Sequence, residues 1–391
     1  MPDVNLPLDA IRRRDGFDAL VDAIGGPDAA RLVGGVVRDT LLGLAPADID
    51  LATTVPPAEV MERLAAARIR AIPTGIAHGT VTAVLPSGPV EITTLRRDVA
   101  TDGRHAIVAF TDTWREDAAR RDFTINALYA DPRSGEVFDY FGGLDDLSNG
   151  RVRFIGDPLQ RIAEDHLRIL RFFRFHARFG DAIDAEGLAA CRLRANDLMA
   201  LSRERIAAEL LKLLVAAKAI DVVDVMIEHG VLRAVLPEIT DAAPLAALAA
   251  REAAAGITPD PIRRLAALVP ADAADAIGAR LKLSNADRKR LIAATQGEGE
   301  EGPRALAYRV GSESAIDRLL LAGRSVEALR DWQPPQLPIG GGALVQRGLA
   351  KGPAVAAALK RIETAWIAEG FPGAARVAAI ADREVAIGLD A

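Results

Sequence analysis

The pattern of apolar and polar positions divides the chain into two parts. From about residue 30 to 140, short apolar or alternating runs are separated by turn residues, which is typical of β-strands. From "DPLQRIAED" onward, apolar residues recur every three or four positions and the segments end at Gly or Pro, which is typical of helices. The pattern therefore predicts an α+β fold, in which an N-terminal head with a small mixed β-sheet and helices is followed by an all-α remainder.

The expected strands are "RLVGG", "IDLAT", "GTVTAVLPSGPVEITTLRR", "TINALYAD" and "GEVFDYF". The third of these holds two alternating runs on either side of "PSGP", which indicates a β-hairpin and puts Glu91 on a strand. The segments "TQGEGEEGPRALA" and "DWQPPQLPIGGGAL" are predicted linkers or loops, because Gly, Pro and polar residues replace the helical period.

Composition narrows the class of protein. With 391 residues the chain is expected to form about two or three domains, and the aromatic content of only 4% favours Ala- and Leu-rich helices in the later part. Cys191 is the single cysteine, which excludes internal disulfides and cysteine-clustered zinc sites. The N-terminus lacks the order of a signal peptide, and no apolar run reaches about 18 residues, so we expect a soluble, cytoplasmic protein without a membrane partner.

The net charge of −6 argues against binding a polyanion through overall charge. A nucleic-acid role must therefore rest on a local patch, and residues 150–180 contain seven arginines against three acids. A solvated helix face is the alternative interpretation of that segment.

Asp48 and Asp50 close the otherwise apolar run "LVGGVVRDTLLGLAPADIDLATT". If both lie on one strand, their carboxylates point to the same face and Ile49 points to the other. Two adjacent carboxylates repel each other unless a divalent cation holds them, and oxygen ligands of this kind suit Mg²⁺ bound together with a substrate phosphate. Two exposed acids in a turn are the competing interpretation.

The preceding "GGVVRDTLLG" favours the metal interpretation. Gly34 and Gly35 are expected to end a strand and open a helix, where free backbone N–H groups favour a phosphate, and Arg38 can add a bidentate contact. A dinucleotide-binding turn needs G-x-G-x-x-G, and the next glycine after this pair is Gly43. A triphosphate site beside a metal-binding pair accounts for all these residues.

Three segments, "GGVVRDTLLGLAPADIDLATT", "EDAARRDFTINALYAD" and "DPLQRIAEDHLRILRFFRF", occur in this order and resemble the bacterial tRNA nucleotidyltransferase and poly(A) polymerase family. The match covers roughly residues 30 to 240. The resemblance implies a catalytic head at 1–150, a helical neck that recognises the base at 151–215, a helical body at 216–280 and a tRNA-binding helical tail at 281–391.

The resemblance also implies roles for individual residues. Asp48 and Asp50 resemble the family's metal carboxylates, Gly34, Gly35 and Arg38 lie where the nucleotide phosphates bind, and Arg121 resembles a nucleotide-contacting arginine. Glu91 is a candidate third catalytic carboxylate, because its strand is expected to neighbour that of the aspartates. The polar segment between Arg97 and Asp117 resembles the family's mobile loop.

Base recognition is predicted from the stripe that Arg161, Glu164, Asp165, Arg168, Arg171 and Arg174 would form on one continuous helix. Cytosine and adenine each present an amino donor beside a ring-nitrogen acceptor, and an acceptor carboxylate at Asp165 with the donor Arg168 matches that pattern. The resemblance assigns the same two positions to base reading. Arg171 and Arg174 would hold Asp165 or touch phosphate, although intrahelical salt bridges are the simpler interpretation.

The predicted activity is template-independent addition of CCA to the tRNA 3′ end from CTP and ATP, with Mg²⁺ as cofactor and pyrophosphate released. An enzyme that adds only A, a poly(A) polymerase and an inactive RNA-binding relative are the alternatives. In the C-terminal half, Ser284 is predicted to cap a helix that carries Arg288, Lys289 and Arg290, which could meet tRNA phosphates. Gly352-Pro353 is predicted to begin another helix and is a second potential phosphate site. Structural capping is the alternative interpretation of both. The sequence identifies no protein partner.

Overall fold

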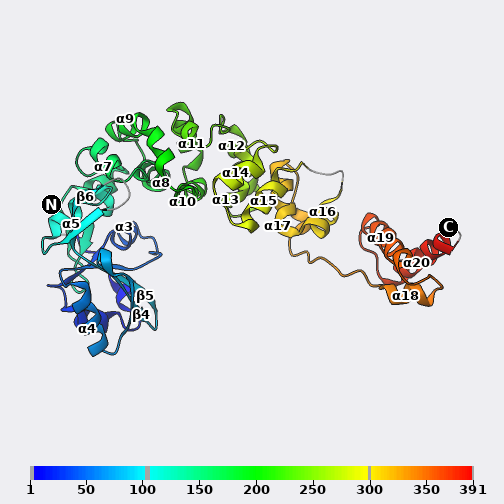
Figure 1. The fold of residues 1–391 in the computed structure, drawn as a ribbon, viewed down its shortest axis with the longest axis horizontal. Coiled ribbons are helices and arrows are strands. Elements are labelled where there is room, and N and C mark those ends of the chain that lie inside the picture. Colours follow the sequence, from blue (N-terminus) through cyan, green and yellow to red (C-terminus); the bar gives the residue numbers. More distant parts are fainter. Residues whose placement is uncertain (1–3, 102–105, 298–300, 390–391) are drawn as a thin grey trace. The chain divides into compact units, whose positions relative to one another are not determined.

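The computed structural model describes residues 4–101, 106–297 and 301–389, which form two compact units, Met1–Thr240 and Asp241–Ala391 (Figure 1). The boundary at Thr240 falls inside the predicted body at 216–280. The four-part division into head, neck, body and tail stays a prediction. Among the described residues, no helix combines the length and the apolar character needed to cross a lipid bilayer.

Within the described residues, the first unit contains a seven-stranded mixed sheet in the order β3-β4-β5-β2-β1-β8-β9. Its strands are β1 Ala30–Val33, β2 Asp50–Thr53, β3 Arg70–Gly75, β4 Thr80–Leu85, β5 Gly88–Thr94, β8 Leu128–Ala130 and β9 Val137–Asp139. β2 and β5 run parallel, and the other neighbouring strands pair antiparallel. The predicted hairpin is confirmed: buried positions alternate along β4, and Leu85 pairs with Gly88 across the turn.

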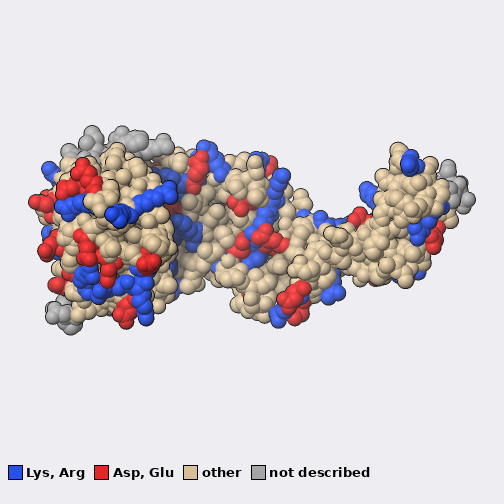
Figure 2. Space-filling model, turned by 90° about the horizontal axis from the view of Figure 1, so that it is seen from below, with Lys and Arg blue, Asp and Glu red and all other residues tan. Residues whose placement is uncertain are grey.

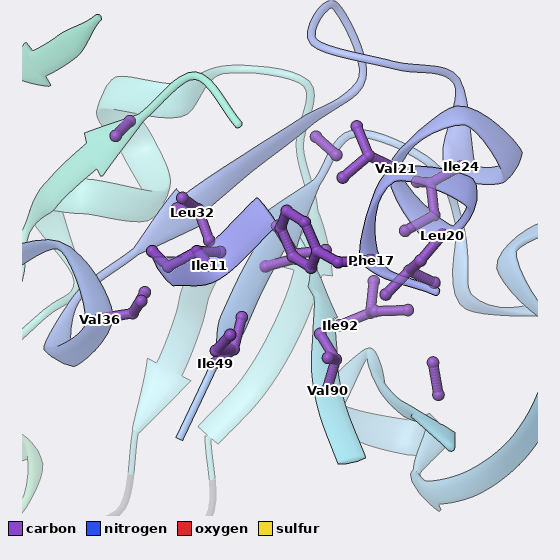
Figure 3. Packing of buried hydrophobic residues seen from close by; sticks show 14 of the residues in the cluster. Ile11, Phe17, Leu20, Val21, Ile24, Leu32, Val36, Ile49, Val90 and Ile92 are labelled. Atoms are coloured by element: carbon purple, nitrogen blue, oxygen red, sulfur yellow. The ribbon is translucent and has the colours of Figure 1, made fainter. Parts of the chain in front are cut away.

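Helices of the first unit cover this sheet and continue beyond it (Figure 1). Their bounds are α1 Asp9–Arg12, α2 Phe17–Ile24, α3 Gly35–Leu41, α4 Pro57–Ala66, α5 Trp114–Ala119, α6 Gly143–Ser148, α7 Pro158–Glu164, α8 Arg168–Phe179, α9 Ala185–Leu193, α10 Arg203–Leu214 and α11 Ala219–Glu228. Apolar residues of α2 and of the strands form one buried cluster, in which Phe17, Leu20 and Ile92 lie close together (Figure 3). This cluster fixes the sheet on which the candidate catalytic residues lie.

The second unit is helical throughout the part that the structure describes. Its helices are α12 Ala243–Ala255, α13 Pro261–Leu268, α14 Ala274–Arg280, α15 Asn285–Thr295, α16 Pro303–Val310, α17 Ser312–Leu321, α18 Gly341–Gln346, α19 Pro353–Ala368 and α20 Ala374–Leu389. Ser284 caps α15 by accepting the backbone N–H of Asp287, as predicted, and Pro353 begins α19. No helix or strand interrupts 333–340, which confirms most of the second predicted linker, but its last four residues belong to α18.

Two sequence-based expectations need correction. The segment predicted as a loop between Arg97 and Asp117 contains strands β6 Arg96–Thr101 and β7 Ala106–Phe110, which pair antiparallel, and then helix α5. Residues 102–105 of that segment lie outside the described residues, and its predicted motion stays a prediction. The charged residues of the segment favoured a loop, but β7 is the apolar run "AIVAF", and it pairs with β6 in a separate two-stranded sheet.

The second correction concerns the helix predicted to carry the polar stripe. It is interrupted at Asp165, whose backbone is extended (φ −151°, ψ 107°), so that α7 and α8 are separate helices. The Asp165 carboxylate accepts the backbone N–H of Leu167 at 3.1 Å, next to the start of α8. A local carboxylate bond of this kind competes with continuation of the helix, and helical periodicity on both sides of the break hid it.

Candidate active site

The candidate catalytic carboxylates lie at one end of the central parallel strands. Asp50 is the first residue of β2 and pairs in register with Glu91 of β5. Asp48 lies in a bend just before β2 instead of on the strand itself, but Ile49 between the two aspartates is buried, so the alternation of faces holds. The prediction that the strand of Glu91 neighbours that of Asp50 is confirmed.

Negative charge accumulates at this point of the sheet. Burial raises the pKa of Asp50, the Glu91 and Asp48 carboxylates add to that effect, and Arg121 opposes it, with a result of about 6. Repulsion of this kind is relieved by a cation, which is the physical signature expected of a divalent-metal site. Within the described ranges, no three acidic, histidine or cysteine side chains converge tightly enough to enclose a metal ion by themselves.

Oxygen donors from two or three carboxylates nevertheless fit a magnesium ion that takes its remaining ligands from substrate phosphate and water. Asp48 and Glu91 are exposed, and Asp50 is half-buried, so a substrate can reach the group. The side chain of the single cysteine, Cys191, is buried.

Gly34 lies between β1 and α3 and adopts φ 72° and ψ −120°, a backbone that a residue with a side chain rarely takes. A Cβ atom there would meet Nη1 of Arg121 at 3.3 Å and the backbone oxygen of Asn126 at 3.4 Å. Gly35 follows as the first residue of α3. The glycine therefore brings the start of α3 close to the arginine that the sequence had singled out.

Arg38 is paired within the protein, whereas an arginine that binds a phosphate directly is expected to have a free guanidinium. Its side chain is buried, its Nη2 lies 2.6 Å from Asp39, and it also donates to the side chain of Asn126. The ring of Phe179 lies 4.3 Å from the guanidinium carbon. In this structure the arginine braces the first turn of α3, and its phosphate contact stays a prediction.

Arg121 is held by two partners. Its Nη2 donates to Asp117 at 3.2 Å, and its Nε donates to the hydroxyl of Tyr129 at 3.1 Å. It also lies near enough to Asp50 to oppose the rise in that residue's pKa. Arg121 therefore lies beside Gly34 and close enough to Asp50 to act on its charge.

The base-reading candidates gather at the break between α7 and α8. Asp165 accepts Nη2 of Arg205 at 2.7 Å, and both side chains are about one third exposed. Arg168 pairs with Glu164 and donates Nη2 to the backbone oxygen of Arg120 at 3.0 Å. Arg205 was missed from the sequence, because its partner is distant along the chain and lies in a different helix.

Arg171 and Arg174 have other partners than the predicted Asp165. Arg171 Nη2 lies 2.6 Å from Asp122, and Arg174 Nε lies 2.5 Å from Glu209. The arginine-rich segment 150–180 is therefore ion-paired along much of its length. On the face drawn in Figure 2, basic and acidic side chains likewise lie beside one another. Nucleotide contact by these two arginines stays a prediction.

Two family models match the chain. The model described as the poly A polymerase head domain matches residues 30–153, and the one described as a probable RNA and SrmB-binding site of polymerase A matches residues 182–243.

Curated relatives match half of the chain or more. The mitochondrial CCA tRNA nucleotidyltransferase 1 of Homo sapiens is 35% identical over 374 residues, which cover 87% of this chain and 83% of the human protein. The CCA-adding enzyme of Anoxybacillus flavithermus is 38% identical over 212 residues, which cover 54% of this chain and 52% of that protein.

Solved structures share the fold. The Bacillus stearothermophilus CCA-adding enzyme in complex with CTP superposes with a TM-score of 0.69 at 24% identity, covering 96% of this chain and 99% of that one. The Thermotoga maritima CCA-adding enzyme complexed with tRNA superposes with a TM-score of 0.70 at 19% identity over the whole of both chains.

Proposed function

The chain belongs to the family of CCA-adding tRNA nucleotidyltransferases, and we propose that it adds C, C and A to the 3′ end of tRNA, using CTP and ATP and releasing pyrophosphate. The observation that carries this proposal is the site at the end of β2 and β5. There Asp50 and Glu91 are paired in register on neighbouring strands. Burial first, and then the negative charge of Glu91, raise the pKa of Asp50, and Arg121 offsets this rise only in part.

Members of this family depend on divalent metal ions, and we propose Mg²⁺ held by Asp48 and Asp50, with Glu91 beside them as the third carboxylate. A bound divalent ion of this kind lowers the pKa of the attacking hydroxyl and neutralises charge on the phosphates. The protein's own part is to orient the carboxylates, since β2 and β5 fix the backbones of Asp50 and Glu91 in one sheet.

The reaction joins the tRNA 3′ oxygen to the α-phosphorus of the incoming nucleotide, and the bond to the pyrophosphate oxygen breaks. Arg121 carries a fixed positive charge next to Gly34, so it suits the triphosphate that lies between the glycine turn and the carboxylates. We assign the remaining phosphate contacts to the backbone at Gly34 and Gly35, and to Arg38 after a change of its partners.

For the base, we propose that Asp165 accepts the amino group of cytosine or adenine and that Arg168 donates to the neighbouring ring nitrogen. Two observations support this. Both side chains lie at the α7–α8 break, and Arg168 is tied to the carbonyl of Arg120, the residue before Arg121. Uracil and guanine present the opposite pattern of donors and acceptors, so their carbonyl oxygen would face the Asp165 carboxylate, acceptor against acceptor.

The activity test uses three RNA substrates: tRNA that ends before CCA, tRNA that ends in CC, and an oligo(A) primer, each with CTP, ATP or both. Addition of three nucleotides to the first substrate, only when both triphosphates are present, is the expected result. Addition of A alone to the second substrate with no C added to the first would indicate an A-only enzyme. Long tails on oligo(A) would indicate a poly(A) polymerase, and no addition at all an inactive relative.

We further propose that the protein works in the cytoplasm, which is consistent with its single, buried cysteine. The human relative's name places that protein in mitochondria. Fractionation of the source cells with an antibody against the chain tests the location.

A further inference from the structure

The short segment from Asp117 to Asp122 lies between the phosphate side and the base side of the proposed site. On the base side, Arg161 donates Nη1 to the backbone oxygen of Ala119 at 2.8 Å, and Arg168 donates to that of Arg120. These two carbonyls lie at the C-terminal end of α5, where intrahelical donors run out. On the phosphate side, Arg121 reaches Gly34. One segment therefore contacts both groups of residues.

Asp117 is the centre of this segment. Its side chain is 1% exposed, and it accepts hydrogen bonds at both carboxylate oxygens. Oδ1 accepts the Arg96 backbone N–H at 3.2 Å and Arg120 Nε at 2.9 Å. Oδ2 accepts the Tyr129 hydroxyl at 2.6 Å and Arg121 Nη2 at 3.2 Å. Donors from the first residue of β6, from the two arginines that follow α5 and from β8 thus converge on a single carboxylate.

The charge of Asp117 is fixed in this arrangement. Burial by itself raises the pKa of a carboxyl, but Arg121, Arg120 and the Tyr129 hydroxyl outweigh burial and lower the pKa of Asp117 to about 2. The carboxylate stays ionised at any pH at which the enzyme works. Since it is buried, it reaches substrate only through the arginines that it holds.

We infer that Asp117 is a positioning residue, which fixes Arg121 toward the triphosphate and the Arg120 carbonyl toward Arg168, and so couples nucleotide binding to base selection. The inference rests on the proposed function, because it takes Arg121 and Arg168 as nucleotide contacts. It predicts that loss of the Asp117 charge affects nucleotide affinity and base choice together, although the residue touches neither part of the nucleotide.

The central variant is Asp117→Asn, which keeps the size of the side chain and removes the charge. Its amide can still accept from Tyr129, but it no longer neutralises Arg121. We expect KM for CTP and ATP to rise about tenfold with a smaller fall in kcat, because the lost contacts orient a binding group. We also expect the CTP-to-UTP ratio to fall severalfold.

Asp146→Asn is the matched control. Asp146 is also buried in the first unit and also holds two arginines, Arg151 and Arg153, and one hydroxyl, that of Thr124. Loss of a buried charge should lower the thermal midpoint in both variants, but only Asp117→Asn should change KM and base choice. A second variant, Tyr129→Phe, removes one hydrogen bond from Asp117 and one from Arg121. We expect it to raise KM two- to threefold, and it replaces Asp117→Asn if that variant does not fold.

The double variant Asp117→Asn/Arg121→Ala decides whether Asp117 acts through Arg121. If it does, the double variant has the nucleotide KM of Arg121→Ala alone. Multiplied effects of the two changes, or unchanged KM in Asp117→Asn and Tyr129→Phe, would overturn the inference. An Arg121→Ala enzyme with wild-type KM would instead overturn the assignment of Arg121 in the proposed function. The two failures are therefore distinguishable.

Discussion

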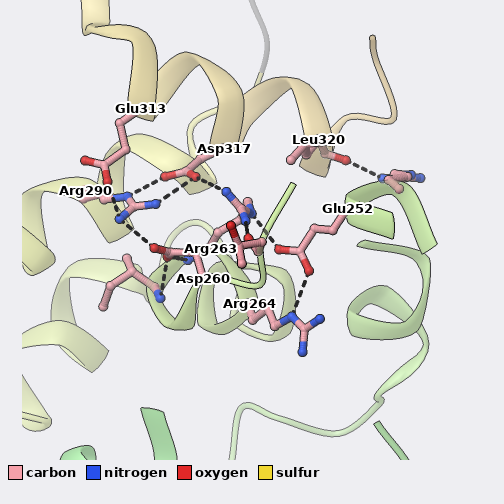
Figure 4. A network of polar contacts seen from close by, with 11 residues as sticks. Glu252, Asp260, Arg263, Arg264, Arg290, Glu313, Asp317 and Leu320 are labelled. Atoms are coloured by element: carbon pink, nitrogen blue, oxygen red, sulfur yellow. Dashed lines mark hydrogen bonds and ion pairs between the residues drawn. The ribbon is translucent and has the colours of Figure 1, made fainter. Parts of the chain in front are cut away.

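Charged side chains cluster in both units of the protein, and the two clusters are built in opposite ways. In the second unit, arginines and carboxylates alternate: Arg263 joins Glu252 to Asp317, and Arg290 joins Asp317 to Asp260 (Figure 4). In the first unit, Asp50 faces Glu91 and lies near Asp48, so like charges are neighbours. One cluster is neutralised within the protein, and the other holds more negative charge than its neighbouring arginine offsets.

The two kinds of cluster have different effects on the stability of the fold. A buried carboxylate that has its own arginine partners holds helices α12, α13, α15 and α17 in one arrangement, and losing one partner is costly. A carboxylate that lies among other carboxylates lowers stability and gains a partner only when a ligand binds. The four experiments below test this contrast, from the largest expected effect to the smallest.

The largest effect is expected for the unneutralised cluster. Asp48→Ala or Asp50→Ala should reduce CMP incorporation into tRNA lacking CCA by about a thousandfold or more, since several kcal/mol of transition-state stabilisation are lost. The thermal midpoint should not fall. A variant that retains more than about a tenth of wild-type turnover would disprove the assignment of the metal carboxylates.

The neutralised cluster should respond in stability instead. Asp317→Ala leaves Arg263 and Arg290 without a shared partner at a site that is fully buried, so we expect the second unit to lose about 3 to 5 kcal/mol in denaturant unfolding. Asp18→Ala is the control, because Asp18 pairs with Arg12 at the surface and should cost at most about 1 kcal/mol. Equal losses in the two variants would mean that burial does not decide the energy.

The third experiment concerns the Asp50 charge, whose removal should raise the free energy of unfolding instead of lowering it. In the unfolded chain Asp50 titrates near about 3.9, and in the folded protein its pKa is about 6. Between these values the folded state binds more protons, so acidification from pH 7 to pH 5 should stabilise the first unit. In metal-free buffer at pH 7.5, Asp50→Asn should therefore be more stable than wild type by about 1 to 3 kcal/mol.

That advantage of Asp50→Asn should shrink as the pH falls through 6 and disappear below about pH 3, where the wild-type carboxyl is protonated in both the folded and the unfolded state. Asp18→Asn is expected to have the opposite sign, because Arg12 lowers the pKa of Asp18. A less stable Asp50→Asn at neutral pH would contradict the idea that this cluster is unneutralised.

Asp165 is an intermediate case, since it has one arginine partner and is about one third exposed. In Asp165→Asn the amide can donate as well as accept, so it can also bond the carbonyl of uracil. The CTP-to-UTP incorporation ratio should therefore fall about tenfold, which corresponds to a loss of about 1 to 2 kcal/mol in the free-energy difference between the two nucleotides. Arg205→Ala is the companion variant and should reduce the ratio less. An unchanged ratio with full activity would return this region to a purely structural role.

The sequence predicted those features that depend on neighbouring residues. The alternation in β4 and β5 predicted the hairpin, and the capping residue Ser284 predicted the start of α15. The "DID" spacing and the expected strand order together predicted that Asp50 and Glu91 lie on neighbouring strands. These signals are local, or they depend on a few long strands that have one dominant pattern.

Features that depend on distant partners could not be read in the same way. The helical period runs through Asp165 without interruption, and the break follows from a single carboxylate that bonds the Leu167 N–H and Arg205. The "RED" preceding "AARRD" contained Asp117, but its bond to Tyr129 requires β8 to be placed in the sheet. Ion pairs between separate elements have no period in the sequence.

The parallel pairing of β2 with β5 has a consequence for how the protein is made. Asp50 and Glu91 become neighbours only after the chain between them, which includes β3 and β4, has folded. Arg121 reaches Gly34 only after β8 has paired with β1, where Ala130 lies opposite Leu32. Long-range pairings of this kind form slowly. A chain emerging from the ribosome therefore carries its aspartates for about eighty residues of synthesis before β8 can pair with β1. The break between α7 and α8 at Asp165 is made later still.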